Sequence, residues 1–290
     1  MKVVVVGGGA WGTAFATILR ERGHDVTVAV RATIDDAPYE EAEFVVIAVP
    51  SSSFREALGH IRGSAPVLSL VKGLDPESGE RLSTLVVDRP VAVLSGPNMA
   101  EEVAAGLPGA AVIAADDEGL LLFLQEAITS LAFRVYTNPD LIGVELCAAA
   151  KNVIGLAAGG VDGLRLGDNA KAAVITRGLA EMARLGEASG AQQETFSGLA
   201  GLGDLVVTCW HPSGRNRRAG ELIARGASPE EAKAQIGQVV EGLTTAPVLR
   251  DLSHRLGVEL PITEGVCAIL GGLPLHELFA TLMGRRPKDE

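Results

Sequence analysis

The hydrophobic positions of the chain follow one pattern in its first half and another in its second half. Up to residue 139, short continuous apolar runs rich in valine recur, and segments with helical spacing separate them. Such a run indicates a strand buried on both faces, as in a parallel sheet, and the alternation predicts a doubly wound α/β sheet. Strands are expected at 3–6, 25–30, 43–49, 66–71, 91–94, 110–115 and 133–136, and helices at 13–22, 54–61, 99–105 and 118–131.

After Asp140 the strand pattern stops, and only helical spacing remains. We predict helices at 172–190, 229–236, 244–256 and 262–271. The turn residues Asn138-Pro139-Asp140 mark a boundary between the two patterns. The sequence therefore predicts an α/β domain over residues 1–139 and an all-α domain over residues 140–290, whose charged tail at 285–290 is expected to fray.

The composition excludes several classes of protein. Hydrophobic residues make up 47% of the 290 residues, so the chain can bury a substantial core. The net charge of -11 argues against nucleic acid as the main partner, because phosphate backbones need a basic surface. The 3 cysteines and 5 histidines lack the spacing of a disulfide framework or a metal site. No targeting segment is visible and no uninterrupted apolar run reaches the ~18 residues of a membrane span, so we expect a cytoplasmic protein without stable membrane insertion.

A glycine motif follows the first predicted strand directly. Gly7, Gly9 and Gly12 fit the spacing G-x-G-x-x-G, and a helix and a second strand come after them. In this context the glycines let backbone N–H groups approach a pyrophosphate at the positive end of a helix. The motif favours a Rossmann-type, dinucleotide-binding sheet, and the alternative is a tight turn with a purely structural role.

The residue after the second predicted strand bears on the choice of dinucleotide. A strict NAD site places Asp or Glu there to bind the ribose hydroxyls, whereas this chain has Arg31. A guanidinium at this place can accept the 2′-phosphate of NADP, so NADP is at least tolerated. The alternative is that Arg31 is a solvated loop residue.

Lys151 lies inside an apolar, small-residue segment that spans residues 143–156. Burying an ammonium group is costly, so one interpretation places Lys151 on the wet face of a helix with its stem along the surface. Polar residues nearby and downstream, at Asn152, Asp162 and Asp204, favour a second interpretation. We hypothesise that Lys151 faces a substrate site near the domain junction, where ligand sites are common, and handles a proton there.

If the reaction at Lys151 is a hydride transfer to a ketone, Lys72 and Asp204 are the residues that complete its site. Such a reaction needs an acid to protonate the new alkoxide and positive charge to polarise the carbonyl. Lys72 lies at the carboxyl end of a predicted strand, where open α/β sheets bind ligands. A like charge and desolvation both lower the pKa of a lysine, so Lys72 and Lys151 can share the two tasks. Asp204 orients a lysine or a substrate hydroxyl, unless it only bonds the backbone of its own tight turn.

The stretch 211–218, HPSGRNRR, is the dense basic segment of an acidic chain. Arginine makes bidentate bonds to phosphate, and a helix opening at Asn216 would add free N–H groups to an anion site. A phosphorylated substrate is one interpretation, and a solvated basic loop is the other.

At these residues the sequence resembles the bacterial NAD(P)-dependent glycerol-3-phosphate dehydrogenases. The resemblance spans nearly the whole chain. It is carried by GGGAWGTAFA near the start, VKGL at 71–74, SGPNMAEEV at 95–103, GVELCAAAKNVIGLAAGGVDGL at 143–164, GDNAKAAVITRGLAEMARLG at 167–186, TFSGLAGLGDLVVTC at 195–209, GRNRR at 214–218 and VVEGLTTA at 239–246. It implies an oxidoreductase that interconverts dihydroxyacetone phosphate and sn-glycerol 3-phosphate by hydride transfer with NAD(P)H, supplies glycerophospholipid synthesis, and forms a homodimer or similar homo-oligomer.

The resemblance also implies roles for individual residues. Lys151 resembles the general acid/base, Lys72 a contact of both cofactor and substrate, and Asp204 a further catalytic residue. The other substrate positions that it implies are Gly96, Asn98, Gly214, Arg215 and Asn216. The implied contacts of the NADP or NAD cofactor are Gly7, Gly9, Ala10, Trp11, Gly12, Arg31, Lys72, Ala100, Arg215, Val239 and Glu241.

The sequence departs from the family pattern at three places. The helix, strand and long loop that normally follow the second strand are missing after Arg31, which bears on the adenosine end of the cofactor site. Asn98-Met99 replaces the usual Ser-Phe, and Gly214 replaces a usual Ser. Because the lysines and Asp204 are unaffected, we expect activity to persist. A dehydrogenase of hydroxyacids and a non-catalytic dinucleotide sensor are the alternative interpretations.

Overall fold

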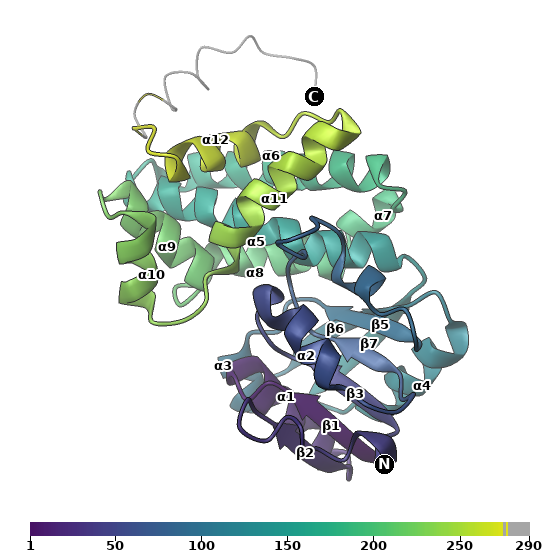
Figure 1. Cartoon of the computed structure of the whole chain (residues 1–290). Helices are drawn as coiled ribbons and strands as arrows, with labels where there is room; N and C mark the ends of the chain where they lie inside the picture. The colour runs from purple at the N-terminus through teal and green to yellow at the C-terminus, as the bar shows by residue number, and fades with distance from the viewer. Residues whose placement is uncertain (275–276, 278–290) are drawn as a thin grey trace.

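The computed structural model describes residues 1–274 and 277, which form a sheet with helices in the first half and a group of packed helices in the second (Figure 1). The predicted fraying tail at 285–290, and with it the end of the predicted second domain, lies outside the described residues. The last strand ends at Asn138 and the first long helix of the second half begins at Leu141. The described fold is thus a Rossmann-type α/β sheet joined to an all-α unit, as predicted.

Within the described residues, the sheet has 7 strands in the order β2-β1-β3-β4-β5-β6-β7. Every predicted strand is present, with ends that differ from the prediction by at most two residues. The strands are β1 Lys2–Val6, β2 Asp25–Ala29, β3 Phe44–Ile47, β4 Val67–Ser69, β5 Val91–Ser95, β6 Gly109–Ala114 and β7 Phe133–Asn138. Since β1 has β2 on one side and β3 on the other, the order of strands reverses beside β1, and ligands bind at such a point in open α/β sheets.

One pair of strands departs from the predicted parallel sheet. β5 and β6 pair antiparallel, with Ser95 opposite Val112, whereas the other pairs are parallel. The helix between them, α3 Ala100–Ala104, has 5 residues, so it spans only about 8 Å. In the described segment between β5 and β6, no helix longer than α3 carries the chain back along the sheet, and β6 starts at the edge where β5 ends.

Alternate residues of β1 face opposite sides of the sheet. Val3 and Val5 pack in one cluster with residues of α1 Ala10–Glu21 and α4 Glu118–Ile128, and Val4 and Val6 pack in another with residues of α2 Phe54–His60. Both faces are therefore covered, which explains the continuous valine run and makes the sheet doubly wound.

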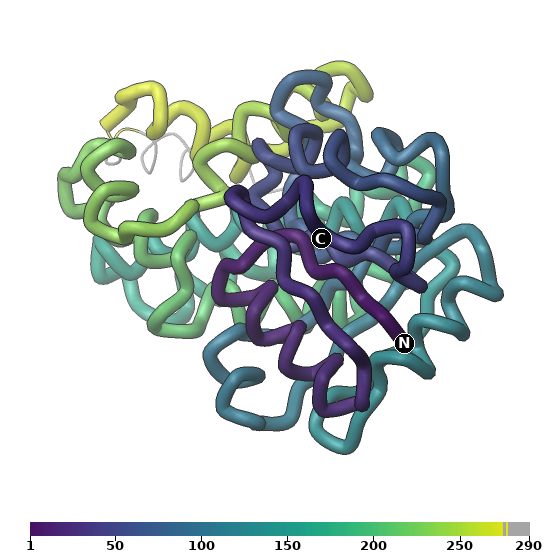
Figure 2. Tube along the Cα trace, turned by 60° about the horizontal axis from the view of Figure 1, so that its bottom comes forward, coloured from purple at the N-terminus to yellow at the C-terminus, as the bar shows by residue number. Residues whose placement is uncertain are grey.

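The connection from β2 to β3 is short, in agreement with the segment missing from the sequence. The short 3-10 helix Tyr39–Glu41 lies in this connection, and Tyr39 is 2% exposed in the same cluster as Val4 and Val6. Tyr39 thus helps α2 to cover this face of the sheet, in a connection that has a short 3-10 helix where parallel strands usually have a crossover α-helix. The purple and blue part of the trace in Figure 2 follows this connection beside β1.

The helical half is built around α5 Leu141–Gly163, which packs against the sheet through Val93, Val112 and Ala114. By length and hydropathy α5 could cross a membrane, although the sequence shows no uninterrupted apolar run of that length. Within the protein, however, 89% of its most apolar segment is buried, as expected for a core helix. The other helices are α6 Gly167–Ala188, α7 Gln193–Phe196, the π-helical turn η4 Leu199–Gly203, α8 Asp204–Trp210, α9 Arg215–Ala224, α10 Pro229–Ile236, α11 Glu241–Leu256 and α12 Pro261–Leu270.

The turn from β1 into α1 requires glycine at two positions. Gly7 has a φ of +115, and a Cβ there would lie 2.4 Å from the Ala48 carbonyl oxygen at the end of β3. A Cβ on Gly12 would lie 2.1 Å from the carbonyl oxygen of Gly7. The motif therefore brings α1 close to the sheet at the point where the strand order reverses.

We predict that Gly12→Ala lowers the free energy of unfolding by about 3 kcal/mol, because the methyl group meets backbone that has little room to move. The exposed Gly59 in α2 is the matched control, since no described atom comes within 4 Å of its Cβ position. Gly59→Ala should raise the stability by up to about 1 kcal/mol through helix propensity. Urea denaturation measures both, and equal stabilities for the two variants would contradict the proposed close approach.

Candidate active site

Two lysines and one aspartate meet where the carboxyl edge of the sheet contacts the helical half. Lys72 follows β4, Lys151 lies within α5, and Asp204 is the first residue of α8. Lys151 Nζ donates to Asp204 Oδ1 at 2.5 Å, and Lys72 Nζ donates to Asp204 Oδ2 at 2.8 Å. One carboxylate therefore bridges two ammonium groups, each from a different part of the chain.

Further hydrogen bonds fix the two ammonium groups. Lys72 Nζ also donates to Asn98 Oδ1 at 2.8 Å and to the Gly96 carbonyl oxygen at 3.1 Å. Lys151 is 5% exposed, and its Nζ donates to Thr208 Oγ1 at 2.9 Å. The structure thus brings together five of the residues that the sequence singled out, from the segments that follow β4 and β5 and from α5 and α8.

Burial and the neighbouring charges shift the pKa values of this cluster. Burial is the main cause that lowers the pKa of Lys151, and the charge of Lys72 adds to it; against the attraction of Asp204, the pKa comes to about 7. For Asp204, burial acts to raise the pKa, but the ammonium groups of Lys151 and Lys72 outweigh it and hold the pKa below its ordinary value. At neutral pH the cluster thus contains an ionised carboxylate and an ammonium group that can release and regain a proton.

A relay of side-chain amides connects the sheet with three helices beside this cluster. Asn152 Nδ2 donates to the Lys72 carbonyl oxygen at 2.7 Å, and its Oδ1 accepts from Asn216 Nδ2 at 2.8 Å. Asn216 Oδ1 in turn accepts from the backbone N–H of Gly242 at 2.9 Å. Asn216, predicted as a substrate residue, therefore holds α9 against α5 and α11.

The glycine turn has the features of a dinucleotide site. Gly9 is the N-cap residue of α1, and none of the described atoms lies within 4 Å of a Cβ placed on it. Within the described part of the chain, no side chain caps the first N–H groups of α1, and its first turn lacks acidic residues. The Trp11 Nε1 donor is buried and has no described partner. These residues fit a pyrophosphate and its neighbouring groups at the positive end of the helix.

Three of the other predicted cofactor positions take part in two separate sets of hydrogen bonds. Glu241, the first residue of α11, accepts from the N–H of Ser51 at 3.0 Å and from its Oγ at 2.6 Å, so it bridges the helical half to the end of β3. Arg215 Nη1 donates to the Val239 carbonyl oxygen at 2.8 Å. The structure does not join Arg31 to either group. Its side chain is 87% exposed and lies 3.9 Å from Glu56. Ala100 begins α3.

Thr208 is not among the predicted site residues, and the backbone at Asp204 differs from the prediction. Thr208 lies one helical turn after Asp204, so both side chains share a face of α8, a spacing that becomes visible only once the helix is recognised. Asp204 was expected in a tight turn, but it follows the π-helical turn η4 and opens α8. A π-helical turn places an extra residue per turn and often occurs at functional sites.

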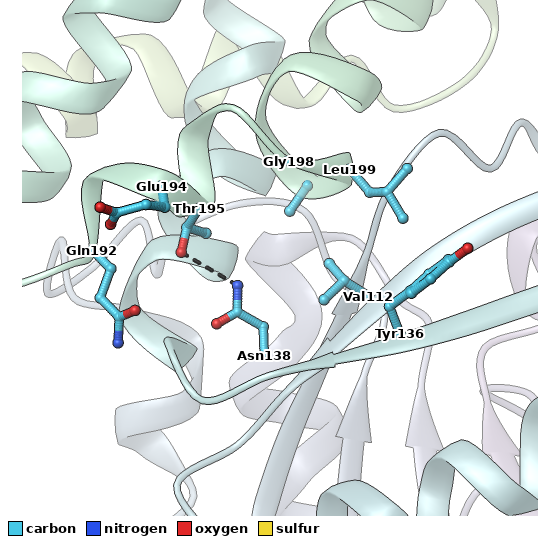
Figure 3. Close-up of a pocket in the computed structure, with 9 residues that line it drawn as sticks. Val112, Tyr136, Asn138, Gln192, Glu194, Thr195, Gly198 and Leu199 are labelled. Atoms are coloured by element: carbon cyan, nitrogen blue, oxygen red, sulfur yellow. Dashed lines mark hydrogen bonds between the residues drawn. The ribbon is translucent and has the colours of Figure 1, made fainter.

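A cavity of about 270 Å³ lies elsewhere, between β6, β7, α7 and η4 (Figure 3). Asn138 Nδ2 donates to Thr195 Oγ1 at 3.3 Å on one wall, while Tyr136 and Leu199 lie on another. The cavity contains none of the predicted site residues. The lysine–aspartate cluster and the glycine turn are therefore the better candidates for catalysis.

We predict that Asp204→Asn destabilises the protein by about 3–5 kcal/mol at pH 6, because it leaves the buried ammonium group of Lys151 and the partly buried one of Lys72 without their shared carboxylate. The loss should be smaller at pH 9. With a folded pKa of about 7, Lys151 is charged at pH 6 and mostly neutral at pH 9, so less attraction is lost there. Urea denaturation at both pH values measures the difference, with the exposed Asp251→Asn as control. A loss that is equal at pH 6 and pH 9 would contradict the lowered pKa.

Comparisons with known proteins agree with this geometry. The family model described as "NAD-dependent glycerol-3-phosphate dehydrogenase C-terminus" matches residues 140–279, and the corresponding N-terminus model matches residues 2–37 and 28–121, two matches that overlap where the segment after β2 is missing. A relative from Moorella thermoacetica, named glycerol-3-phosphate dehydrogenase [NAD(P)+], is 41% identical over 321 residues, which cover 98% of this chain and 96% of the relative. A relative of the same name from Citrobacter koseri is 42% identical and covers 100% of this chain and 97% of its own length.

A solved structure supports the same assignment. The crystal structure of glycerol-3-phosphate dehydrogenase from Coxiella burnetii has a TM-score of 0.92 to this chain at 36% sequence identity, and the match covers 98% of this chain and 99% of that one. The alignment with the Moorella thermoacetica relative is longer than the 290 residues of this chain, so that relative has segments that this chain lacks. This chain belongs to the NAD-dependent glycerol-3-phosphate dehydrogenase family.

Proposed function

We propose that this chain is a glycerol-3-phosphate dehydrogenase, which interconverts dihydroxyacetone phosphate and sn-glycerol 3-phosphate with NADH or NADPH. The full-length relatives of that name and the two family models support this activity. The observation that carries the chemistry is the buried Lys72–Asp204–Lys151 cluster, whose central carboxylate accepts from both ammonium groups. The product supplies the glycerol phosphate backbone of phospholipids.

Lys151 is the general acid and base in this proposal. In the reducing direction, Lys151 Nζ gives a proton to the oxygen on C2 of dihydroxyacetone phosphate as that oxygen becomes an alkoxide. In the oxidising direction, the neutral amine takes the hydroxyl proton of sn-glycerol 3-phosphate. A pKa of about 7 suits both directions, because each form is then well populated near neutral pH. Asp204 and Thr208 hold Nζ in place by accepting from it.

Lys72 and Asn98 form the neighbouring wall of the substrate site in this proposal. The Lys72 ammonium polarises the ketone, and the positive charge is present before the reaction begins, which favours a developing negative oxygen. Asn98 accepts from Lys72 through Oδ1, whereas its Nδ2 is buried and without a described partner. We assign this N–H donor to a substrate oxygen, so Asn98 supplies the donor that a serine supplies in the usual family pattern. Gly96 lies in the same loop as Asn98, and its carbonyl oxygen accepts a hydrogen bond from Lys72 Nζ.

The start of α9 binds the substrate phosphate in this proposal. Gly214 is the N-cap residue and Arg215 is the first residue of the 10-residue helix, so the free N–H groups of its first turn lie beside an exposed guanidinium. Arginine and a helix N-terminus together favour a dianionic group. Asn216, bonded to Asn152 and Gly242, keeps this turn at a fixed distance from Lys151.

Gly7, Gly9, Ala10, Trp11 and Gly12 hold the pyrophosphate and adjoining groups of NAD or NADP in this proposal, and the nicotinamide supplies the hydride when the cofactor is bound. Lys72, Arg215, Val239 and Glu241 border the nicotinamide end, with Arg31 and Ala100 at the periphery. Glu241 keeps the helical half close to β3 through Ser51, which helps to exclude water. We also propose a cytoplasmic homodimer, supported by the family resemblance alone, and light scattering of the purified protein tests the dimer.

A kinetic assay with one variant tests the function. We expect the purified protein to oxidise NADPH or NADH when dihydroxyacetone phosphate is added, and Lys151→Met to lower kcat by at least about a thousandfold. Because the variant leaves the glycine turn intact, its affinity for the cofactor should stay within about threefold of the wild type.

Two outcomes would count against this proposal. Cofactor binding without turnover of any ketone would favour a dinucleotide sensor, and turnover of hydroxyacids but not of the triose phosphate would favour another dehydrogenase. A Lys151→Met variant that keeps most of its kcat would remove Lys151 from the mechanism. As a matched control, the exposed Lys233→Met should behave like the wild type.

A further inference from the structure

The loop at residues 211–214 joins α8, which carries Asp204 and Thr208, to α9, which carries Arg215 and Asn216. One side chain bonds two carbonyl groups of this loop. Arg217 Nε donates to the His211 carbonyl oxygen at 3.2 Å, and Arg217 Nη2 donates to the Pro212 carbonyl oxygen at 3.0 Å. The first turn of α9 thus fastens the loop that leads into it.

The remaining side of this guanidinium faces two carboxylates. Arg217 Nη1 donates to Asp162 Oδ2 at 2.5 Å and lies 3.2 Å from Glu221 Oε2. The Arg217 side chain is 14% exposed. Because each of the three nitrogen atoms already has a protein partner, Arg217 can turn a pair of N–H groups toward a phosphate only by giving up one of these contacts. It therefore differs from Arg215, which is exposed at the start of the helix.

Asp162 connects this loop to the helix that carries the general acid. It lies in α5, about 16 Å beyond Lys151 along the helix axis at ~1.5 Å per residue. Its Oδ2 also accepts from Lys171 Nζ of α6 at 2.8 Å, and that ammonium lies 4.9 Å from the ring centre of Trp210 at the end of α8. Although burial acts to raise the pKa of Asp162, the bonds from Lys171 and Arg217 keep that pKa below its ordinary value.

We propose that Arg217, held by Asp162, is a positioning residue that sets the phosphate subsite at the start of α9. The inference rests on the proposed function, because it assumes that Arg215 and the first turn of α9 meet the substrate phosphate. Arg217 acts through the loop at 211–214 and does not touch the substrate. Asp162 fixes the guanidinium relative to α5, so this ionic contact adds to the Asn216–Asn152 hydrogen bond in setting the distance between the phosphate subsite and Lys151.

Two variants test this role. Arg217→Lys keeps the charge, but one ammonium group cannot reach His211, Pro212 and Asp162 together, and Asp162→Asn keeps the shape but removes the charge. For each variant we expect KM for dihydroxyacetone phosphate to rise about tenfold and kcat to stay within about twofold of the wild type. In the double variant, KM should be about as high as in the more impaired of the two single variants, because both substitutions break the same contact.

A second readout separates positioning from general damage to the fold. The dissociation constant of inorganic phosphate, measured by titration calorimetry on the whole protein, should rise about tenfold in both variants, since the anion subsite itself is displaced. Arg215→Ala, which removes the proposed anchor, shows the size of a direct effect. Arg62→Lys and Asp168→Asn make the same chemical changes at exposed positions and should leave KM, kcat and phosphate binding unchanged.

Several results would overturn the inference. These are a fall in kcat with KM unchanged, a rise in KM with phosphate binding unchanged, or variants that match the exposed controls. If one of the two variants does not fold, unchanged phosphate binding in the other is enough to reject the inference. If the wild type does not turn over dihydroxyacetone phosphate, the proposed function fails, whereas phosphate binding still decides whether Arg217 and Asp162 set an anion subsite.

Discussion

The site depends on one buried carboxylate that is shared by two ammonium groups. Taking three charges out of water is expensive, and the attraction between them offsets the cost only when geometry and hydrogen bonding are good. Both oxygens of Asp204 are used, Ser95 Oγ adds a donor at 3.3 Å, and each lysine has a second acceptor. One positive charge is left over in this group, and it lies where the proposed reaction develops a negative oxygen.

The fold supplies these three residues from elements that are far apart in the chain. Lys72 comes from the carboxyl edge of the sheet, Lys151 from the core helix and Asp204 from the residue after a π-helical turn. Hydrogen bonds then close a circuit around the site, from Lys72 through Asn152 and Asn216 to α11 and back to β3 through Glu241 and Ser51. The sheet and the helices are thereby held at a fixed distance across the proposed hydride-transfer site.

Much of the fold was predictable because its signals are local. A run such as 3–6, buried on both faces, identifies a strand without knowledge of its neighbours, and the glycines before α1 identify the turn. The antiparallel pairing of β5 and β6 was not predictable, because it depends on the path of a short connection. The candidate site was predictable only in part. Lys72 and Lys151 stand 132 and 53 residues before Asp204, so no local pattern joins them, and the family resemblance brought them into one hypothesis. Arg215 and Arg217 look alike in sequence, and only the structure separates the exposed Arg215, which we propose binds the substrate phosphate, from Arg217, which bonds the loop at 211–214.

The central claim concerns the proton on Lys151, and NMR titration of its side chain tests it most directly. In the free protein, labelled at lysine and assigned with Lys151→Arg, we expect the Nζ group to titrate with a pKa of about 7, because burial and the neighbouring ammonium group disfavour its charged form. As the pH rises through this value, Lys151 loses its proton, so kcat/KM for ketone reduction should fall and kcat/KM for alcohol oxidation should rise. A Lys151 side chain that stays protonated up to the pKa of ~10.4 of a solvated lysine would contradict the role assigned to it.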